Sequence, residues 1–143
     1  MKRKVLILCT GNSCRSIMAE AWINHLLSDR WEAVSAGVEP SRINPRAIQV
    51  MAEAGIDLSK YHSKSVTEFL SDASIDLVIT VCDHARETCP VFLRPVPQIH
   101  IGFDDPTPYT SEPDEIALPK FREVRDAIRN RLVEFLREFM FQE

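Results

Sequence analysis

Hydrophobic and polar positions along the chain alternate between two periods, which predicts strands and helices in turn. Short, nearly continuous apolar runs predict four strands, at residues 5–8, 31–37, 75–81 and 97–103. Apolar side chains at helical spacing predict helices over residues 16–27, 44–55 and 118–139, with a short helical segment at 65–70. Strands that alternate with helices favour a parallel sheet. We therefore expect an α/β fold in three layers, with a four-stranded parallel sheet and helices on both faces.

End signals support two of these helices. Ser16 is in position to cap the first helix, and Asn44 precedes Pro45 at the start of the second, which Gly55 ends. The apolar stripe of the last helix is expected to lie in the core. The proline-rich, acidic stretch at 104–115 is expected to form an ordered or lid-like loop over a site.

Composition narrows the class of protein. The 143 residues are 45% hydrophobic, enough for a core, so we expect one domain spanning residues 1–143. A net charge of -4 gives no electrostatic reason to bind nucleic acid or an anionic membrane. The apolar run after the first residues is too short for an export signal, and no run approaches the length of a membrane span. We expect a cytoplasmic protein, in which cysteines are reactive, metal-binding or simply buried rather than structural disulfides.

The first predicted strand leads into the loop "CTGNSCRS", which carries the chemistry. Ligands of parallel sheets bind beyond the carboxyl ends of the strands, where Cys9 lies. Backbone amides and the positive end of the next helix converge there, so the loop predicts an oxyanion site formed by Thr10, Gly11, Asn12, Ser13, Cys14 and Arg15. Gly11 would let the backbone bend toward the anion. The same field is expected to lower the pKa of Cys9 and make it a nucleophile, with the Ser16 hydroxyl as a hydrogen-bond donor.

A plainer interpretation is that Cys9 is a small buried residue and Arg15 a surface charge. The catalytic interpretation is favoured because a strand precedes Cys9, a glycine lies within the loop and a helix follows it. Cys14 is expected to be structural.

Several motifs along the chain together resemble those of the thioredoxin-coupled arsenate reductases. They are "CTGNSCRS", "MAE", "SAG", "NP.AI", "DLVITVC", a second cysteine before Pro90, and "GFDDP". These reductases share the fold of low-molecular-weight protein tyrosine phosphatases, and the resemblance covers essentially the whole chain.

The resemblance implies a role for each matching residue. Cys9 would be the nucleophile, Arg15 and Ser16 the anion clamp and thiolate partner, Asp105 the general acid, and Cys82 and Cys89 a redox relay. It implies arsenate as substrate, with phosphate or sulfate competing, and a part in arsenic detoxification. No bound cofactor is implied; electrons would come from thioredoxin, or from glutaredoxin with glutathione. We take a monomer as the default.

The residues allow this chemistry. If the strands before Cys9 and Cys82 are neighbours, the two sulfurs can meet and form a disulfide. Residues 83–89 predict a short helix, which sets Cys82 and Cys89 about 10.5 Å apart along its axis. Because a disulfide tolerates Cα atoms at most about 7 Å apart, the segment would have to unwind when they join.

Other interpretations stay open. Cys82 and Cys89 could be inert, or with His84 part of a zinc site, although their spacing is not that of common zinc motifs. Asp104 and Asp105 could be turn carboxylates, and His25, His62 and His100 receive no role. A phosphatase of the same fold, or a carrier of phosphoryl groups, would leave Cys82 and Cys89 unexplained. Phosphatases of the family carry a tyrosine after Asp-Pro where this chain has Thr107.

A cation site is the last feature implied by the resemblance. Family members that bind potassium use Asn, Glu, Ser and Asp, of which Asn12, Glu20 and Ser35 match the first three. Lys64 stands at the position of the fourth. We expect its ammonium group to replace the metal ion; the alternative is an ordinary surface lysine.

Overall fold

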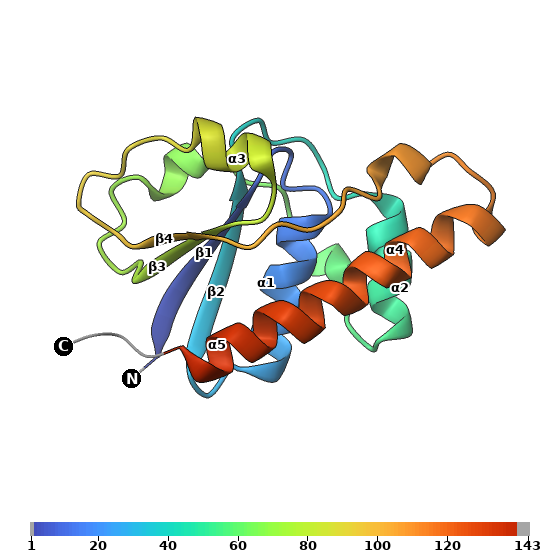
Figure 1. Ribbon diagram of the computed structural model, residues 1–143, viewed down its shortest axis with the longest axis horizontal. Coiled ribbons are helices and arrows are strands. Elements are labelled where there is room, and N and C mark those ends of the chain that lie inside the picture. Colours follow the sequence, from blue (N-terminus) through green and yellow to red (C-terminus); the bar gives the residue numbers. More distant parts are fainter. Residues whose placement is uncertain (1, 140–143) are drawn as a thin grey trace.

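A computed structural model describes residues 2–139, and Figure 1 shows a parallel sheet flanked by helices. Its four strands are β1 (Arg3–Cys9), β2 (Trp31–Gly37), β3 (Leu77–Thr80) and β4 (Gln98–His100). They lie in the order β2-β1-β3-β4, and all three pairings are parallel. This confirms the predicted α/β class and its four-stranded sheet.

The centre of the sheet explains the apolar runs of the sequence. β1 pairs with β2 on one side and β3 on the other, so both of its edges are bonded. Residues 5–9 of β1 and all four residues of β3 are buried. Strands covered on both faces are expected to be continuously hydrophobic, and these are. Because β1 and β3 are neighbours, Cys9 and Cys82 leave the same edge of the sheet side by side.

The α-helices are α1 (Arg15–Leu26), α2 (Pro45–Glu53), α3 (Asp83–Thr88), α4 (Asp114–Ile128) and α5 (Glu134–Glu138). Asn44 caps α2 by accepting a hydrogen bond from the Arg46 amide, as predicted. The predicted cap of α1 is wrong: Cys14 holds that position without a side-chain cap, and Ser16 lies inside the helix. The amides of this first turn are thus free of side-chain capping and remain donors beside the anion loop.

Two predicted elements differ in length or type. The segment at 65–70 is a 3-10 helix, Val66–Phe69, capped by Ser65. β4 is shorter than expected, because only Gln98–His100 form a regular ladder with β3. The chain nevertheless continues beside β3, since the amides of Ile101 and Phe103 donate to the carbonyls of Thr80 and Val81.

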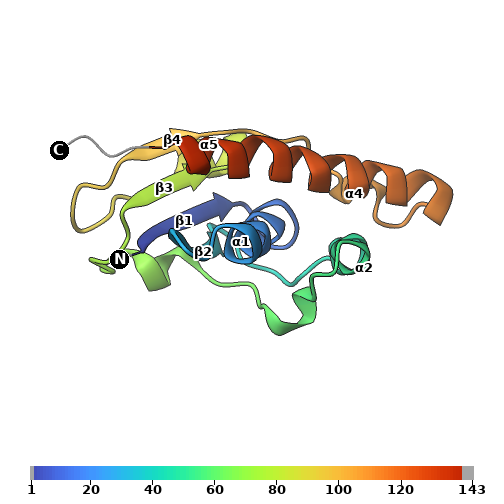
Figure 2. The same ribbon diagram turned by 90° about the horizontal axis from the view of Figure 1, so that it is seen from below.

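The C-terminal helical segments, α4, a π-helical stretch (Arg129–Val133) and α5, form one long rod across α1 (Figures 1 and 2). Its apolar stripe is core, as predicted: Leu118, Phe121 and Leu132 are buried. Two tryptophans bond to this rod, with the Nε1 of Trp22 donating to the Arg125 carbonyl and that of Trp31 to the Leu136 carbonyl. Within residues 2–139, no helix is long and apolar enough to cross a membrane.

Candidate active site

The loop that follows β1 surrounds a cavity of about 210 Å³ at the carboxyl edge of the sheet. Six residues between 9 and 15 line the cavity, and the loop from 104 to 113 adds two more. The lining residues are Cys9, Thr10, Gly11, Ser13, Cys14, Arg15, Asp105 and Thr107. The structure thus brings together the nucleophile, the arginine and the acid that the sequence predicts.

Asn12 fixes the shape of this loop from behind. Among residues 2–139 it is the one non-glycine residue with left-handed backbone, at φ 49°. Its side chain is fully buried and donates to the Ser16 and Ser35 hydroxyls, at 2.8 and 2.9 Å, and accepts from the Lys64 amide at 2.9 Å. Such a conformation persists where neighbours over-determine it. The left-handed position of this loop therefore falls on Asn12, next to Gly11, which lines the cavity.

Gly37 lets the end of β2 approach the loop closely. A Cβ atom placed on Gly37 would lie 2.5 Å from the Thr10 carbonyl oxygen and 2.9 Å from the Asn12 nitrogen. Both are backbone atoms that cannot move aside without distorting the loop. The glycine of the "SAG" motif is thus a packing requirement of the anion site.

Arg15 lies between the anion loop and the loop that carries Asp105. One terminal nitrogen of its guanidinium donates to the Phe103 carbonyl at 3.1 Å, and the other lies 3.7 Å from Asp105 Oδ2. The other oxygen of Asp105, Oδ1, accepts from the amide and the hydroxyl of Thr107 at 3.0 and 2.7 Å. The hydrogen bonds from Thr107 were not predicted; "DPT" is the sequence pattern of a side chain that bonds to the backbone two residues on.

Cys9 ends β1 and Cys82 follows β3, so the pairing of these strands places the two thiols next to each other. The Cys82 side chain and burial raise the pKa of Cys9 well above its usual value, against the lowering effects of Arg15 and the Ser16 amide. Cys9 lowers the pKa of Cys82 to about 5, with further hydrogen bonds from Thr10 and the Ala85 amide. These shifts favour Cys82 as the residue that carries the negative charge of the pair. The pKa of Cys9 is raised rather than lowered as predicted, because Cys82 and burial outweigh Arg15 and the Ser16 amide.

The buried hydroxyl oxygen of Ser16 accepts a hydrogen bond from Asn12, which leaves its hydrogen available for the donor role predicted for it. The backbone amide of Ser16 also lowers the pKa of Cys9. Cys14 is buried and its pKa is raised to about 12 by desolvation, which agrees with the inert role predicted for it.

The segment between Cys82 and Cys89 forms the predicted short helix, α3. Cys82 is its N-cap, where its sulfur accepts from the Ala85 amide at 3.4 Å and lies 3.3 Å from the Thr10 hydroxyl. Cys89 ends the helix half-buried, and burial raises its pKa. Neither of these two cysteines, nor Cys9 or Cys14, is joined in a disulfide.

The zinc interpretation finds no donor set. Within the described part of the chain, no three His, Cys, Asp or Glu side chains lie together as metal ligands. His84 instead contacts Glu39 at 3.1 Å, and His100 contacts Asp83 at 3.3 Å and the Thr80 hydroxyl at 2.8 Å. These contacts of His84 and His100 hold α3 against the rest of the fold.

Glu20 is buried below the anion loop with Lys64 beside it. Burial raises the pKa of Glu20, while the Ser35 hydroxyl and Lys64 act in the opposite direction. Lys64 Nζ lies 3.6 Å from Glu20 Oε1 and donates to the His62 carbonyl at 3.0 Å. Lys64 is therefore an inward-facing cation, not a free surface lysine.

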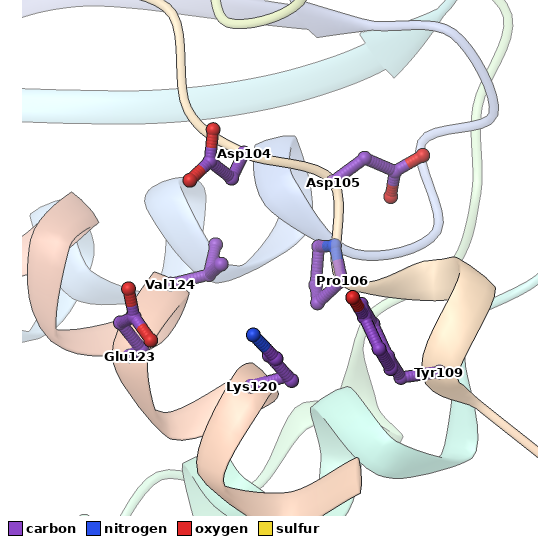
Figure 3. A pocket seen from close by; sticks show the side chains of 7 residues that line it. All are labelled: Asp104, Asp105, Pro106, Tyr109, Lys120, Glu123 and Val124. Carbon is purple, nitrogen blue, oxygen red and sulfur yellow. The ribbon is translucent and has the colours of Figure 1, made fainter. Parts of the chain in front are cut away.

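A second cavity, of about 310 Å³, lies on the other side of the Asp105–Pro106 segment (Figure 3). Lys120 extends into it from α4, over the ring of Tyr109 at 5.1 Å from its centroid. The Asp105 carboxylate points away from Lys120, toward the anion loop. The acid therefore serves the first cavity, although its backbone borders both.

Comparison with known proteins settles the family. The family described as "Low molecular weight phosphotyrosine protein phosphatase" matches residues 4–142. The chain belongs to this family. Within it, the chain is 44% identical to an arsenate reductase of Bacillus subtilis (strain 168), over 94% of this chain and 96% of the relative. It is 42% identical to an arsenate reductase of Halalkalibacterium halodurans, over 94% and 95% of the two chains.

Comparison with solved structures supports the same family assignment. The structure "An arsenate reductase in oxidized state" aligns with a TM-score of 0.78 at 28% identity, covering 95% of this chain and 98% of the other. "An arsenate reductase in the phosphate binding state" aligns with a TM-score of 0.74 at 31% identity, covering 96% and 99%. A low molecular weight protein tyrosine phosphatase from T. tengcongensis aligns with a TM-score of 0.70 at 29% identity, covering 93% and 99%.

Proposed function

We propose that this chain reduces arsenate to arsenite, with Cys9 as nucleophile and Cys82 as the second thiol. The observation that carries the proposal is the place of the two thiols: the neighbouring strands β1 and β3 bring Cys9 and Cys82 to one edge of the sheet, and the Cys82 sulfur lies 3.3 Å from the Thr10 hydroxyl of the anion loop. A phosphatase needs one cysteine there, whereas a two-electron reduction needs two that can join. The names of the relatives, arsenate reductases over nearly their whole length, support the same substrate.

In the first step Cys9 attacks the arsenic atom, a sulfur–arsenic bond forms, and one oxygen leaves as water. Asp105 gives that oxygen its proton and takes up the proton lost by the Cys9 thiol. The anion is held by the amides of the loop from Thr10 to Arg15 and by the Arg15 guanidinium. The Ser16 amide on the Cys9 sulfur stabilises the negative charge as the thiol loses its proton.

In the second step the Cys82 thiolate attacks the Cys9 sulfur. The Cys82 thiolate supplies the electron pair of the new sulfur–sulfur bond, and the sulfur–arsenic bond breaks with its electron pair on arsenic, which leaves as arsenite. The Thr10 hydroxyl and the Ala85 amide, which still contact the Cys82 sulfur after Cys9 has bonded to arsenic, favour the thiolate that this step requires. Phosphorus does not accept such an electron pair, so a phosphate ester cannot enter this step.

In the third step Cys89 attacks Cys82 and frees Cys9. Helix α3 separates the two cysteines in the reduced chain, so it must unwind before their disulfide closes. The unwound segment would present the disulfide to a thiol protein, which reduces it and restores the starting thiols. We take thioredoxin as the donor, with glutaredoxin and glutathione as the alternative, no bound cofactor, a monomer, and the cytoplasm as the compartment where these donors stay reduced.

Lys64 is proposed to take the place of a potassium ion beside the anion loop. Its ammonium group lies between Glu20 and the His62 carbonyl, and its amide holds Asn12. Asn12, Glu20 and Ser35 form the remaining part of the site. A fixed cation beside buried Glu20 leaves no net charge for a metal ion to neutralise.

A single-turnover experiment tests the proposal. The fully reduced protein is mixed with excess arsenate in the absence of any donor, and arsenite is counted. We expect one arsenite per chain, then steady turnover after addition of thioredoxin, its reductase and NADPH. Absence of arsenite together with phosphate release from phosphotyrosine would show the chain to be a phosphatase instead.

Residual phosphatase activity is a second candidate, favoured by the fold shared with the T. tengcongensis phosphatase. Cys9, Arg15 and Asp105 suffice for hydrolysis of a phosphate ester. Thr107, whose hydroxyl bonds Asp105, offers no ring to hold an aryl group. We therefore expect phosphatase activity that is weak and independent of Cys82 and Cys89.

A further inference from the structure

We infer that Thr110 and Asn44 position the carboxyl group of Asp105, although neither residue lines the anion cavity. The inference rests on the proposed function, in which Asp105 is the proton donor. It assigns to two polar side chains outside the cavity the task of holding that donor at a fixed place relative to the anion loop.

The two oxygens of Asp105 have different surroundings. Oδ1 accepts two hydrogen bonds from Thr107, whereas Oδ2 faces the Arg15 guanidinium at 3.7 Å. Two donors directed at Oδ1 leave Oδ2 as the oxygen that carries the proton in the acid form. Oδ2 also lies on the side of the anion loop, where a leaving oxygen would take up that proton.

Thr107 is in turn fixed by Thr110. The Thr110 hydroxyl donates to the Thr107 carbonyl at 2.6 Å, and the Thr110 amide donates to the same oxygen at 3.1 Å. The Asn44 side-chain amide donates to the Thr110 hydroxyl oxygen at 2.9 Å. The hydroxyl of Thr110 therefore accepts from Asn44 and donates to Thr107, whose own hydrogen bonds end on Asp105.

The chain of hydrogen bonds closes on the anion loop itself. The backbone amide of Asn44 donates to the Ser13 carbonyl at 2.8 Å, and Ser13 lines the cavity two residues before Arg15. The series runs from Ser13 through Asn44, Thr110 and Thr107 to Asp105, which faces Arg15. The position of the acid is thus set from the loop that binds the anion, not from the distant core.

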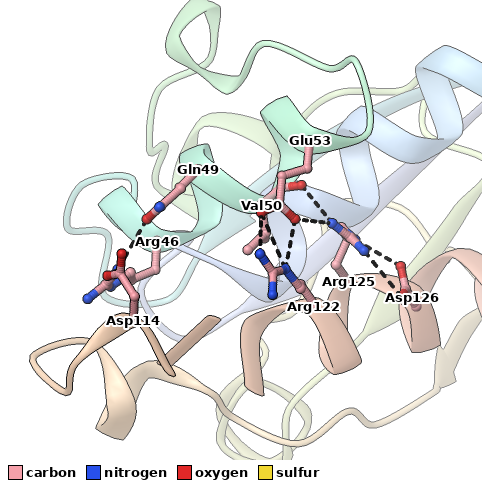
Figure 4. A network of polar contacts seen from close by, with 8 residues as sticks. All are labelled: Arg46, Gln49, Val50, Glu53, Asp114, Arg122, Arg125 and Asp126. Atoms are coloured by element: carbon pink, nitrogen blue, oxygen red, sulfur yellow. Dashed lines mark hydrogen bonds and ion pairs between the residues drawn. The ribbon is translucent and has the colours of Figure 1, made fainter. Parts of the chain in front are cut away.

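Arg46 braces the same segment from α2. Its guanidinium donates to the Thr110 and Glu112 carbonyls at 3.3 and 2.8 Å, and it pairs with Asp114 at the start of α4 (Figure 4). Glu53, at the other end of α2, pairs with Arg122 and Arg125 of α4. Two clamps hold α2 against α4, so the segment between β4 and α4 is fastened beyond Thr110 as well.

The test removes the Thr110 hydroxyl without changing the shape of the side chain. We expect Thr110→Val to lower the single-turnover rate of arsenite formation about 10-fold, because a small misplacement of a proton donor is costly. Thr110→Ser, which keeps the hydroxyl, should restore most of the rate. In an Asp105→Asn background, Thr110→Val should cause no further loss, because the group that it positions is gone.

Asn44→Ser is the second variant, since serine still caps α2 but cannot reach Thr110, and it should lower the rate in the same manner. Hydrogen exchange of the Thr107 amide gives a readout independent of the reaction, and should accelerate in Thr110→Val and Asn44→Ser but not in Thr110→Ser. Equal losses with and without Asp105, or unchanged exchange at Thr107, would overturn the inference. Failure of the wild-type chain to form arsenite would instead refute the proposed function.

Discussion

The anion loop and the segment from Cys82 to Cys89 leave neighbouring strands at the same edge of the sheet, yet they are held very differently. Asn12 and Cys14 of the anion loop are buried, and the Asn12 side chain alone ties the loop to two hydroxyls and a distant amide. α3 has six residues and is held from outside by contacts of His84 and His100 with carboxylates whose side chains are largely exposed. Binding requires a site that is already formed, whereas disulfide exchange requires a segment that can come apart.

The largest effect on turnover is expected from replacing Cys9, the nucleophile at the start of the anion loop. Cys9→Ser should abolish turnover, lowering it by on the order of 10⁴-fold or more. Cys14→Ser, the matched change within the same loop, should keep much of the activity and cost about 1–3 kcal/mol of stability for burying a hydroxyl. Steady-state arsenite formation and thermal unfolding measure both. Equal loss of arsenate binding and stability in the two variants would contradict the assignment.

The next largest effect is expected in the segment from Cys82 to Cys89. Cys89→Ala should release one arsenite per chain and then stop, because the Cys9–Cys82 disulfide stays out of reach of the donor. Hydrogen exchange of residues 83–88 should be slow in the reduced protein and fast in the oxidised one, since α3 must unwind. Equal protection in both forms, or many turnovers of Cys89→Ala with thioredoxin, would show that the relay is wrong.

Cys82, which lies where α3 meets the anion loop, is expected to be a thiolate in the reduced protein. Absorbance of the reduced protein at 240 nm should rise with an inflection near the pKa of Cys82, about 5, and Cys82→Ser should remove that step while Cys89→Ser keeps it. Because this pKa is lowered from 9.0 on folding, the stabilisation is complete above about pH 9 and is lost as the pH falls through about 5. An inflection that survives in Cys82→Ser would place the charge on another thiol.

The smallest effect concerns the cation beneath the anion loop. Exchange of sodium for potassium should change neither the melting temperature nor the rate, because Lys64 already provides the charge. Lys64→Met should destabilise the protein by about 1–3 kcal/mol at neutral pH, and less in acid, where Glu20 takes up a proton. A clear rise in melting temperature of the wild-type protein in potassium would count against this role.

Sequence reasoning found the sheet, the anion loop and α3 because each has a local pattern: apolar runs, a cysteine–arginine spacing, and helix formers between two cysteines. It also placed Cys9, Arg15 and Asp105 together, through a family motif rather than through geometry. The structure was needed to show that their side chains line one cavity.

The errors share one physical origin, which is contact between residues far apart in the chain. The left-handed backbone falls on Asn12 because Ser35 and Lys64 hold its side chain. The thiolate lies on Cys82 because β1 and β3 bring Cys9 to it. The contacts of Thr110 with Asn44 likewise span 66 positions and carry no local pattern.

The two indole hydrogen bonds to the C-terminal rod have a consequence for the order of assembly during synthesis. Trp22 and Trp31 lie in the first quarter of the chain, but their partners, the carbonyls of Arg125 and Leu136, are made more than a hundred residues later. A nascent chain that stops before α4 therefore lacks both of these hydrogen bonds and the rod that packs across α1. Tryptophan fluorescence of chains stalled at successive lengths would report the moment at which the rod docks and the core closes.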